Sequence, residues 1–233
     1  MKNLLPLAFL LLSLPVAAQE LKPVPVVELF TSQGCNSCPP ADAALGAMAQ
    51  RADVLALSLH VDYWDYLGWK DSFSTTWATA RQRAYAKSFR SRSVYTPQAI
   101  VNGAGDAVGS DRGKVQALLA KAKVAAFSAA VDGARAVLTF AADGIPADIV
   151  LVDYLASAPV VITRGENAGN TFTYHNVVRR LDVLGTWDGK AGHAPVALPP
   201  RAAGQSRALM VQGQDMGPLL GGVRLPDGPA AGI

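Results

Sequence analysis

Cysteine and histidine are scarce in this chain: its 233 residues include two cysteines, Cys35 and Cys38, and three histidines. A framework of several disulfides, which spreads its cysteines along an exported protein, is therefore excluded. A tetrahedral zinc site at the cysteine pair would need two further ligands, and only His60, His175 and His193 could supply a nitrogen. What remains is one thiol pair within a single turn.

A strong charge bias is also absent. The chain carries 21 Lys and Arg residues against 18 Asp and Glu residues, a formal net charge of +3. So small an excess does not predict nucleic acid as a partner, because such binding needs a concentrated positive surface. The sequence shows no convincing nucleophile–base pair, glycine-rich phosphate loop or carboxylate dyad, and we expect no cofactor.

The apolar run at the N-terminus predicts export. Lys2 supplies a basic start, residues 4–16 are apolar, and Val16-Ala17-Ala18 has the small-residue pattern of a cleavage site. The run is too short for a stop-transfer helix, and no cysteine follows the cleavage site to carry a lipid. We predict a signal peptide over residues 1–18, a periplasmic or secreted mature protein, and no stable membrane insertion after cleavage.

The pattern of apolar residues divides the mature chain into two parts. The first part alternates strands (residues 24–30, 53–61, 98–102 and 106–108) with helices (after Pro39, over residues 75–89 and after Asp111). From residue 127 on, turn signals separate strand-like segments, and no helix is predicted. About 215 residues remain after removal of residues 1–18, a length that favours two domains, at residues 20–124 and 127–233.

The helix predicted over residues 75–89 has two faces. Apolar side chains at helical spacing should point inward, namely Trp77, Ala80, Ala84 and Tyr85. The basic side chains Arg81, Arg83 and Lys87 fall on the other face. We interpret them as a solvated surface and not as an anion site.

The segment Cys35-Asn36-Ser37-Cys38 places its two sulfurs within reach of each other at the start of a helix. The positive helix end and greater exposure should lower the thiol pKa of Cys35 and make it the attacking sulfur, with Cys38 resolving the mixed disulfide. A disulfide across four residues constrains the unfolded chain little, so it would be a poor staple. Redox chemistry is favoured, and a structural disulfide or a metal-binding thiol pair stays open.

Aromatic residues make up only 7% of the chain, yet residues 62–71 hold Tyr63, Trp64, Tyr66 and Trp69. Packing against the sheet is one interpretation. The other is a hydrophobic lip beside the cysteines that grips a substrate, for which Tyr63, Trp64 and Trp69 are the candidates. Further along, residues 164–170 are predicted to form a turn, which is either ordered by its own side-chain hydrogen bonds, or a small binding site, or docked against the first domain.

The order strand–CxxC–helix–strand–helix, followed by Thr96-Pro97, a β-hairpin and a last helix, resembles the thioredoxin fold. The resemblance implies an α/β thioredoxin-like N-terminal domain, here followed by an antiparallel β-rich, sandwich-like C-terminal domain. It also implies that Pro97 is cis, faces the disulfide and belongs to the catalytic site, and that Thr96 contributes to substrate binding. The motifs ELFTSQGCNSCPPAD, HVDYWDYLGWKD, RQRAY, YTPQAIVNG and RGENAGNTFTYHNVVR together resemble a family of exported bacterial thioredoxin-like proteins of uncharacterised function.

The function predicted from these features is that of an exported thiol–disulfide oxidoreductase. It would exchange disulfides with protein or small-molecule thiols through Cys35 and Cys38, without a cofactor or a metal. Two alternatives are a non-catalytic binding protein on a thioredoxin scaffold and a soft-metal site, with copper(I) preferred by the thiolates.

Overall fold

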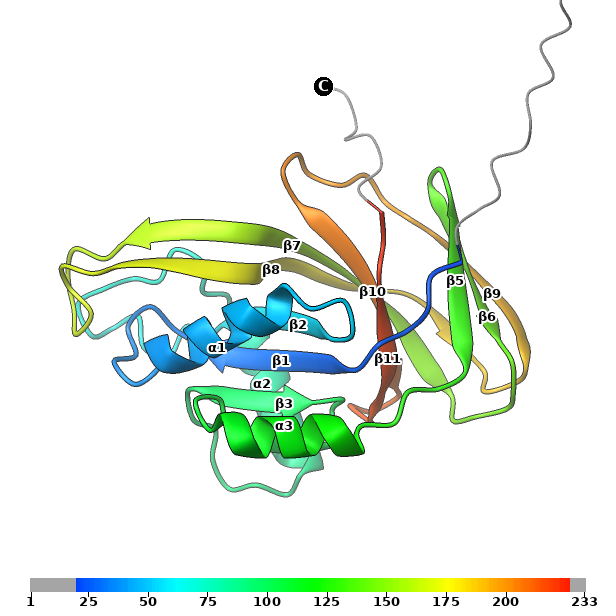
Figure 1. The fold of residues 1–233 in the computed structure, drawn as a ribbon, viewed down its shortest axis with the longest axis horizontal. Helices are drawn as coiled ribbons and strands as arrows, with labels where there is room; N and C mark the ends of the chain where they lie inside the picture. Colours follow the sequence, from blue (N-terminus) through cyan, green and yellow to red (C-terminus); the bar gives the residue numbers. More distant parts are fainter. Residues whose placement is uncertain (1–19, 227–233) are drawn as a thin grey trace, which may run out of the picture.

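The computed structural model describes residues 20–226 as a mixed α/β protein with one eight-stranded and one three-stranded sheet (Figure 1). The predicted signal peptide, residues 1–18, lies outside the described residues. Between residues 20 and 226, no helix combines the length and the apolar character that a membrane crossing requires.

Four strands and three helices form the first half of the chain. The strands are β1 (Val26–Thr31), β2 (Leu55–His60), β3 (Gln98–Val101) and β4 (Gly105–Val108). β1 is parallel to β2 and antiparallel to β3, which pairs antiparallel with β4. Helices α1 (Pro39–Ala49) and α3 (Arg112–Lys121) pack on one face of these strands, and α2 (Thr76–Ser88) packs on the other. Because both faces are covered, every residue of β1 and β2 is buried.

Local capping signals set the starts of the helices. The side chain of Thr75 accepts a hydrogen bond from the backbone N–H of Ala78 before α2, and Asp111 does the same with Lys114 before α3. Helix α1 has prolines in its first turn, where backbone N–H groups lack partners inside the helix. The three helix starts predicted from the sequence are confirmed.

The second half of the chain consists of strands, which divide between the two sheets. Strands β7 (Ala147–Val161), β8 (Thr171–Trp187), β10 (Ser206–Gly213) and β11 (Leu219–Arg224) extend the large sheet in the order β11-β10-β7-β8-β2-β1-β3-β4. Strands β5 (Phe127–Asp132), β6 (Arg135–Phe140) and β9 (Gly192–Ala197) form the small sheet. Side chains of both sheets share one apolar core, in which Phe140 and Trp187 stack with ring centroids 3.8 Å apart.

The two halves meet where β2 and β8 run side by side. The pairing is short: Ser58 pairs with Val177, and the Asn176 side chain donates a hydrogen bond of 2.8 Å to the carbonyl oxygen of Ala56. The core under α2 continues across this joint, from Leu57 of β2 to Val178 of β8. The domain boundary at residues 124–127 stays a prediction, while hydrogen bonds and packing cross it.

The expected solvated position of Arg81 is wrong. Its side chain is 8% exposed and points to Glu28 of β1, donating hydrogen bonds of 2.6 and 3.0 Å to the two carboxylate oxygens. Arg81 also donates to the Tyr85 hydroxyl and to Gln212 of β10, while Tyr85 donates to Glu28 at 2.5 Å. Helical spacing predicts an outward position for Arg81, because a spacing argument cannot show that a buried partner, Glu28, lies on a strand distant in the sequence. Ala80, which was expected to point inward, is exposed instead.

Replacing Arg81 by methionine should lower the free energy of unfolding by about 3 kcal/mol, because it leaves the Glu28 carboxylate buried without its charged partner. Chemical denaturation of the purified protein measures this difference. Arg83→Met on the same helix is the matched control, since Arg83 is exposed, and it should change stability little. Equal stabilities for the two variants would contradict the assigned role of Arg81.

Candidate functional site

Cys35 and Cys38 form a disulfide in the loop between β1 and α1. The loop is closed by backbone hydrogen bonds of 3.2 Å, from Cys35 N–H to Ser32 and from Cys38 N–H to Cys35. Cys38 is the N-cap residue of α1, so Cys35 lies one turn before the helix and not within it. The disulfide therefore sits at the positive end of the helix dipole.

Both cysteines are buried. Cys35 is 1% exposed and Cys38 is fully buried, so the expectation that Cys35 is clearly the more exposed sulfur is wrong. Sequence reasoning could not show this, because the segments that lie against the CxxC loop, near Trp64, Thr96 and Asn167, are far away along the chain. Any thiol that attacks the disulfide must first pass this cover.

Thr96 lies directly at the disulfide. Its hydroxyl donates to Cys35 Sγ at 3.3 Å and accepts a hydrogen bond of 2.8 Å from the Trp64 indole N–H. The Ser37 hydroxyl lies 3.4 Å from the same sulfur. The Thr96–Pro97 peptide bond is cis, as the resemblance implied. The structure thus brings Thr96 and Trp64 to the cysteine pair, while their roles in binding and that of Pro97 in catalysis stay predictions.

The remaining aromatic candidates divide between the site and the core. The Trp69 indole N–H donates to Gln33 Oε1 at 2.8 Å, so Trp69 holds the segment that leads into Cys35. Tyr63 turns toward α2, where its hydroxyl donates to Gln82 at 3.2 Å. Tyr66 is 80% exposed at the tip of the loop. Trp69 therefore remains a candidate beside the site, and the Tyr63 hydroxyl is bonded to α2.

A buried pair of side chains, His60 and Asp71, lies beside the CxxC loop. His60 Nδ1 lies 2.7 Å from Asp71 Oδ2, and the same oxygen accepts a hydrogen bond of 2.8 Å from the backbone N–H of Gln33. Burial acts to raise the pKa of Asp71, but His60 and backbone N–H groups outweigh it and hold that pKa below its ordinary value. Across residues 20–226, no three His, Cys, Asp or Glu side chains are grouped as metal ligands.

Asp42 is a second buried acid near the disulfide. It lies four residues after Cys38, and side chains at this spacing share one face of a helix. Burial raises the pKa of Asp42 to about 7, although the nearby His60 acts to lower it. Sequence reasoning missed this residue because an aspartate in the first turn of a helix is ordinarily solvated and complements the helix dipole.

Asn167 reaches the site from the turn between β7 and β8. Its side-chain amide donates to the carbonyl oxygens of Gln33 and Cys35, at 2.9 and 3.0 Å. In the same turn Gly165 lies against the aromatic loop, where an added β-carbon would come within 3.1 Å of Trp69 Cβ. The left side of Figure 1 shows the tip of the β7–β8 hairpin beside the cyan loop that follows β2. The turn therefore docks on the CxxC loop, and within the turn the Asn170 side chain also donates a hydrogen bond of 3.1 Å to the carbonyl oxygen of Asn167.

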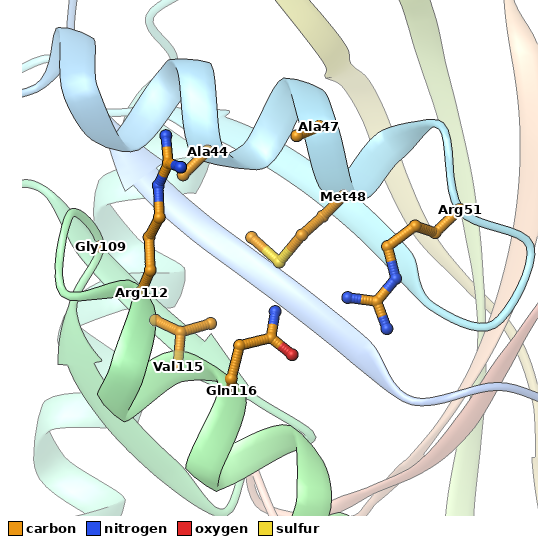
Figure 2. Close-up of a pocket in the computed structure, with 8 residues that line it drawn as sticks. All are labelled: Ala44, Ala47, Met48, Arg51, Gly109, Arg112, Val115 and Gln116. Atoms are coloured by element: carbon orange, nitrogen blue, oxygen red, sulfur yellow. The ribbon is translucent and has the colours of Figure 1, made fainter.

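A separate pocket of about 230 Å³ lies between α1 and α3 (Figure 2). Met48 and Val115 point into it from the two helices, and Arg51 and Arg112 lie at its ends. Neither cysteine lines it. We therefore place the candidate functional site at the disulfide and not in this pocket.

The fold and the site together define a mixed α/β protein with a buried CxxC disulfide after β1, an interior strand of its large sheet. Residues 26–212 match the family described as "Protein of unknown function (DUF1223)". The chain belongs to this family.

Two solved structures are similar to the chain. One is a crystal structure of a protein from Agrobacterium tumefaciens, with 32% sequence identity and a TM-score of 0.73, covering 91% of this chain and 99% of that one. The other is HBP35 of Porphyromonas gingivalis, with 14% identity and a TM-score of 0.60, covering 91% and 78% of the two chains; this is a likeness of fold alone. No curated protein matches the chain.

Proposed function

We propose that the protein is a thiol–disulfide oxidoreductase that acts through Cys35 and Cys38. The observation that carries the proposal is the pairing of the two cysteines as a CxxC disulfide before α1, with the Thr96 hydroxyl 3.3 Å from Cys35 Sγ. A disulfide that closes so short a loop stabilises a fold less than one that closes a long loop. Reactivity explains this pair better than stabilisation does.

The arrangement of the first four strands supports a thioredoxin-like fold for this half of the chain. They run in the order β2-β1-β3-β4, with β1 and β2 parallel and the β3–β4 hairpin antiparallel to β1. Two helices lie on one face and one on the other. The thioredoxin fold has this order, and it places its reactive cysteines between the first strand and the first helix.

The reaction is an exchange in two steps. A substrate thiolate attacks Cys35 Sγ, a mixed disulfide forms, and Cys38 leaves as a thiolate that takes up a proton. A second substrate thiol, deprotonated, then attacks the substrate sulfur of the mixed disulfide, and Cys35 leaves. Two thiols become one disulfide, and the protein gains two thiols. The reverse sequence reduces a substrate disulfide.

Cys35 is the sulfur better suited to form the mixed disulfide. The hydroxyls of Thr96 and Ser37 lie within 3.4 Å of Cys35 Sγ and can donate hydrogen bonds to a thiolate there. Hydrogen bonds to the charged form, together with the positive end of α1, lower the pKa of a thiol. The proposed partners are protein or small-molecule thiols and disulfides, and the N-terminal apolar run supports a periplasmic or secreted location.

Replacing Cys38 by serine should trap the intermediate, because the mixed disulfide on Cys35 then lacks its resolving thiol. The reduced variant, mixed with an oxidised cysteine peptide, should gain the mass of one peptide chain in intact-protein mass spectrometry. Cys35→Ser is the matched control and should form far less adduct, since the hydroxyls that stabilise a thiolate, those of Thr96 and Ser37, lie at Cys35 Sγ. Equal trapping by both variants, or by neither, would count against the proposed function.

A binding protein on the same scaffold is the second candidate. The burial of both sulfurs favours it, because a disulfide that nothing can reach serves only to shape the loop around Gly34. The trapping experiment separates the two, since a binding protein forms no adduct that depends on Cys35.

A further inference from the structure

We propose that Asn167 determines which substrates reach the disulfide. Its side-chain amide holds the β7–β8 turn on the CxxC loop. A substrate peptide that carries a primary amide beside its cysteine takes over the hydrogen bonds of the Asn167 amide when the turn lifts. The inference rests on the proposed function and adds to it a residue from the strand-rich half of the chain and a class of substrate.

The turn is an exposed segment with one buried side chain, that of Asn167. Residues 163–166 and 168–170 are exposed, whereas Asn167 is 6% exposed. Its two N–H groups reach back more than 130 positions along the chain to Gln33 and Cys35. Gly165 adds a packing contact with Trp69, at a positive φ of 77° that a larger residue would not readily adopt.

The other covering groups are held more firmly. Trp64 is bonded to Thr96, which precedes β3, and Trp69 is bonded to Gln33. The aromatic loop is also held from within, where Asp65 accepts hydrogen bonds from the backbone of Asp71 and from the Ser74 hydroxyl. The β7–β8 turn is therefore the part of the cover that can lift while the strands stay paired.

Lifting the turn removes a donor from two buried acceptors, of which the Cys35 carbonyl oxygen keeps the backbone N–H of Cys38. The carbonyl oxygens of Gln33 and Cys35 flank Gly34, and one –NH₂ group satisfies both at 2.9 and 3.0 Å. A buried carbonyl without a donor is costly, so a substrate gains affinity if it brings a donor of the same geometry. A primary amide, as in the side chains of Asn and Gln, has that geometry. A thiol without one leaves the Gln33 carbonyl oxygen to water and the Cys35 carbonyl oxygen with the Cys38 N–H alone.

The rate at which the disulfide is reduced tests whether Asn167 holds the turn over it. The full mature chain, oxidised, is reduced with dithiothreitol, and alkylation with mass counting follows the appearance of thiols. Asn167→Ala should open about tenfold faster than the unchanged protein, because two hydrogen bonds no longer hold the turn. Glu166→Ala, at an exposed neighbour in the same turn, should react at the unchanged rate. Equal rates for Asn167→Ala and the unchanged protein would overturn the proposal.

The substrate class is tested with two model peptides, acetyl-Gly-Asn-Cys-Asn-Gly-amide and the same peptide with leucine for both asparagines. Leucine has a similar shape without the amide, and the common backbone and terminal amide cancel in the comparison. The asparagine peptide should form the mixed disulfide several-fold faster with the unchanged protein. Equal rates for the two peptides would overturn the amide preference.

Two further checks keep the outcomes distinct. If Asn167→Ala does not fold by circular dichroism, Gly165→Ala replaces it, because the added methyl pushes the same turn away from Trp69 and should also speed opening. Opening by dithiothreitol needs only a disulfide and its cover, so it can succeed even if the Cys38→Ser variant traps nothing. Failure of the oxidoreductase function and failure of the role of Asn167 therefore give different results.

Discussion

Replacing Cys35 by serine should reduce catalysed disulfide exchange to the level of the uncatalysed reaction. A serine hydroxyl is not ionised near neutral pH, whereas the thiolate is the nucleophile in exchange. The hydroxyls of Thr96 and Ser37 lie at Cys35 Sγ, so the remaining thiol, Cys38, is the less activated of the two. The measurement is the rate at which the protein, kept reduced by glutathione, reduces an oxidised peptide.

Asn36→Ala is the matched control for this experiment. Asn36 lies between the two cysteines and is exposed, so its replacement should leave the rate near that of the unchanged protein. Thermal unfolding of both variants checks that the loop remains folded. A Cys35→Ser variant that exchanges at the unchanged rate would remove the oxidoreductase proposal and leave the binding protein in its place.

The second large effect is a loss of stability with rising pH that depends on Asp42. Burial raises the pKa of this carboxyl from 3.8 to about 7, so the folded protein keeps a proton that the unfolded chain has already released. The contribution to stability is fully present below the unfolded pKa and is lost as the pH rises through the folded pKa. Each pH unit in this window costs up to about 1.4 kcal/mol per proton, which sums to roughly 4 kcal/mol between pH 4 and 7.

Denaturant unfolding of the protein and of Asp42→Asn across this pH range measures the effect. Subtracting the two curves removes the titration of other groups, as far as they are independent of Asp42. The exposed Asp53 gives a control, because Arg51 holds its pKa below the ordinary value and Asp53→Asn should not reproduce the loss. A difference between the protein and Asp42→Asn that stays constant from pH 4 to 7 would show that Asp42 keeps an ordinary pKa.

The local elements of the fold could be predicted because their signals are local. Thr75 and Asp111 cap helices whose starts follow at once, and the alternation of apolar strands and helices gave β1 to α3 in the right order. The strand-like character predicted from residue 127 on is present up to the last hairpin, β10–β11. Strand lengths were less predictable: β8 continues to Trp187, since its outer part is only half-buried and lacks a clear alternation.

The features that sequence reasoning missed all depend on partners that are distant along the chain. The predicted solvent-exposed position of Arg81 is wrong because helical spacing cannot show that its partner, Glu28, lies on β1. Asn167 looked like an ordinary turn residue, since its acceptors are backbone oxygens that leave no mark in the composition of the chain. The expected greater exposure of Cys35 is wrong for the same reason, since segments near Trp64, Thr96 and Asn167 cover it. In each case only the assembled fold defines the neighbours of the residue.

The pairing of β8 with β2 also bears on how the protein is made. Until β8 is in place, β2 is the edge of the first half, and an apolar edge strand with open hydrogen-bonding groups invites pairing with another chain. Synthesis reaches His60, the last residue of β2, long before it reaches Thr171, the first residue of β8. At about 5–20 residues per second, that edge remains open for roughly 5–20 s. During that interval a chaperone, or delayed folding, would keep β2 from pairing with another chain before β8 arrives.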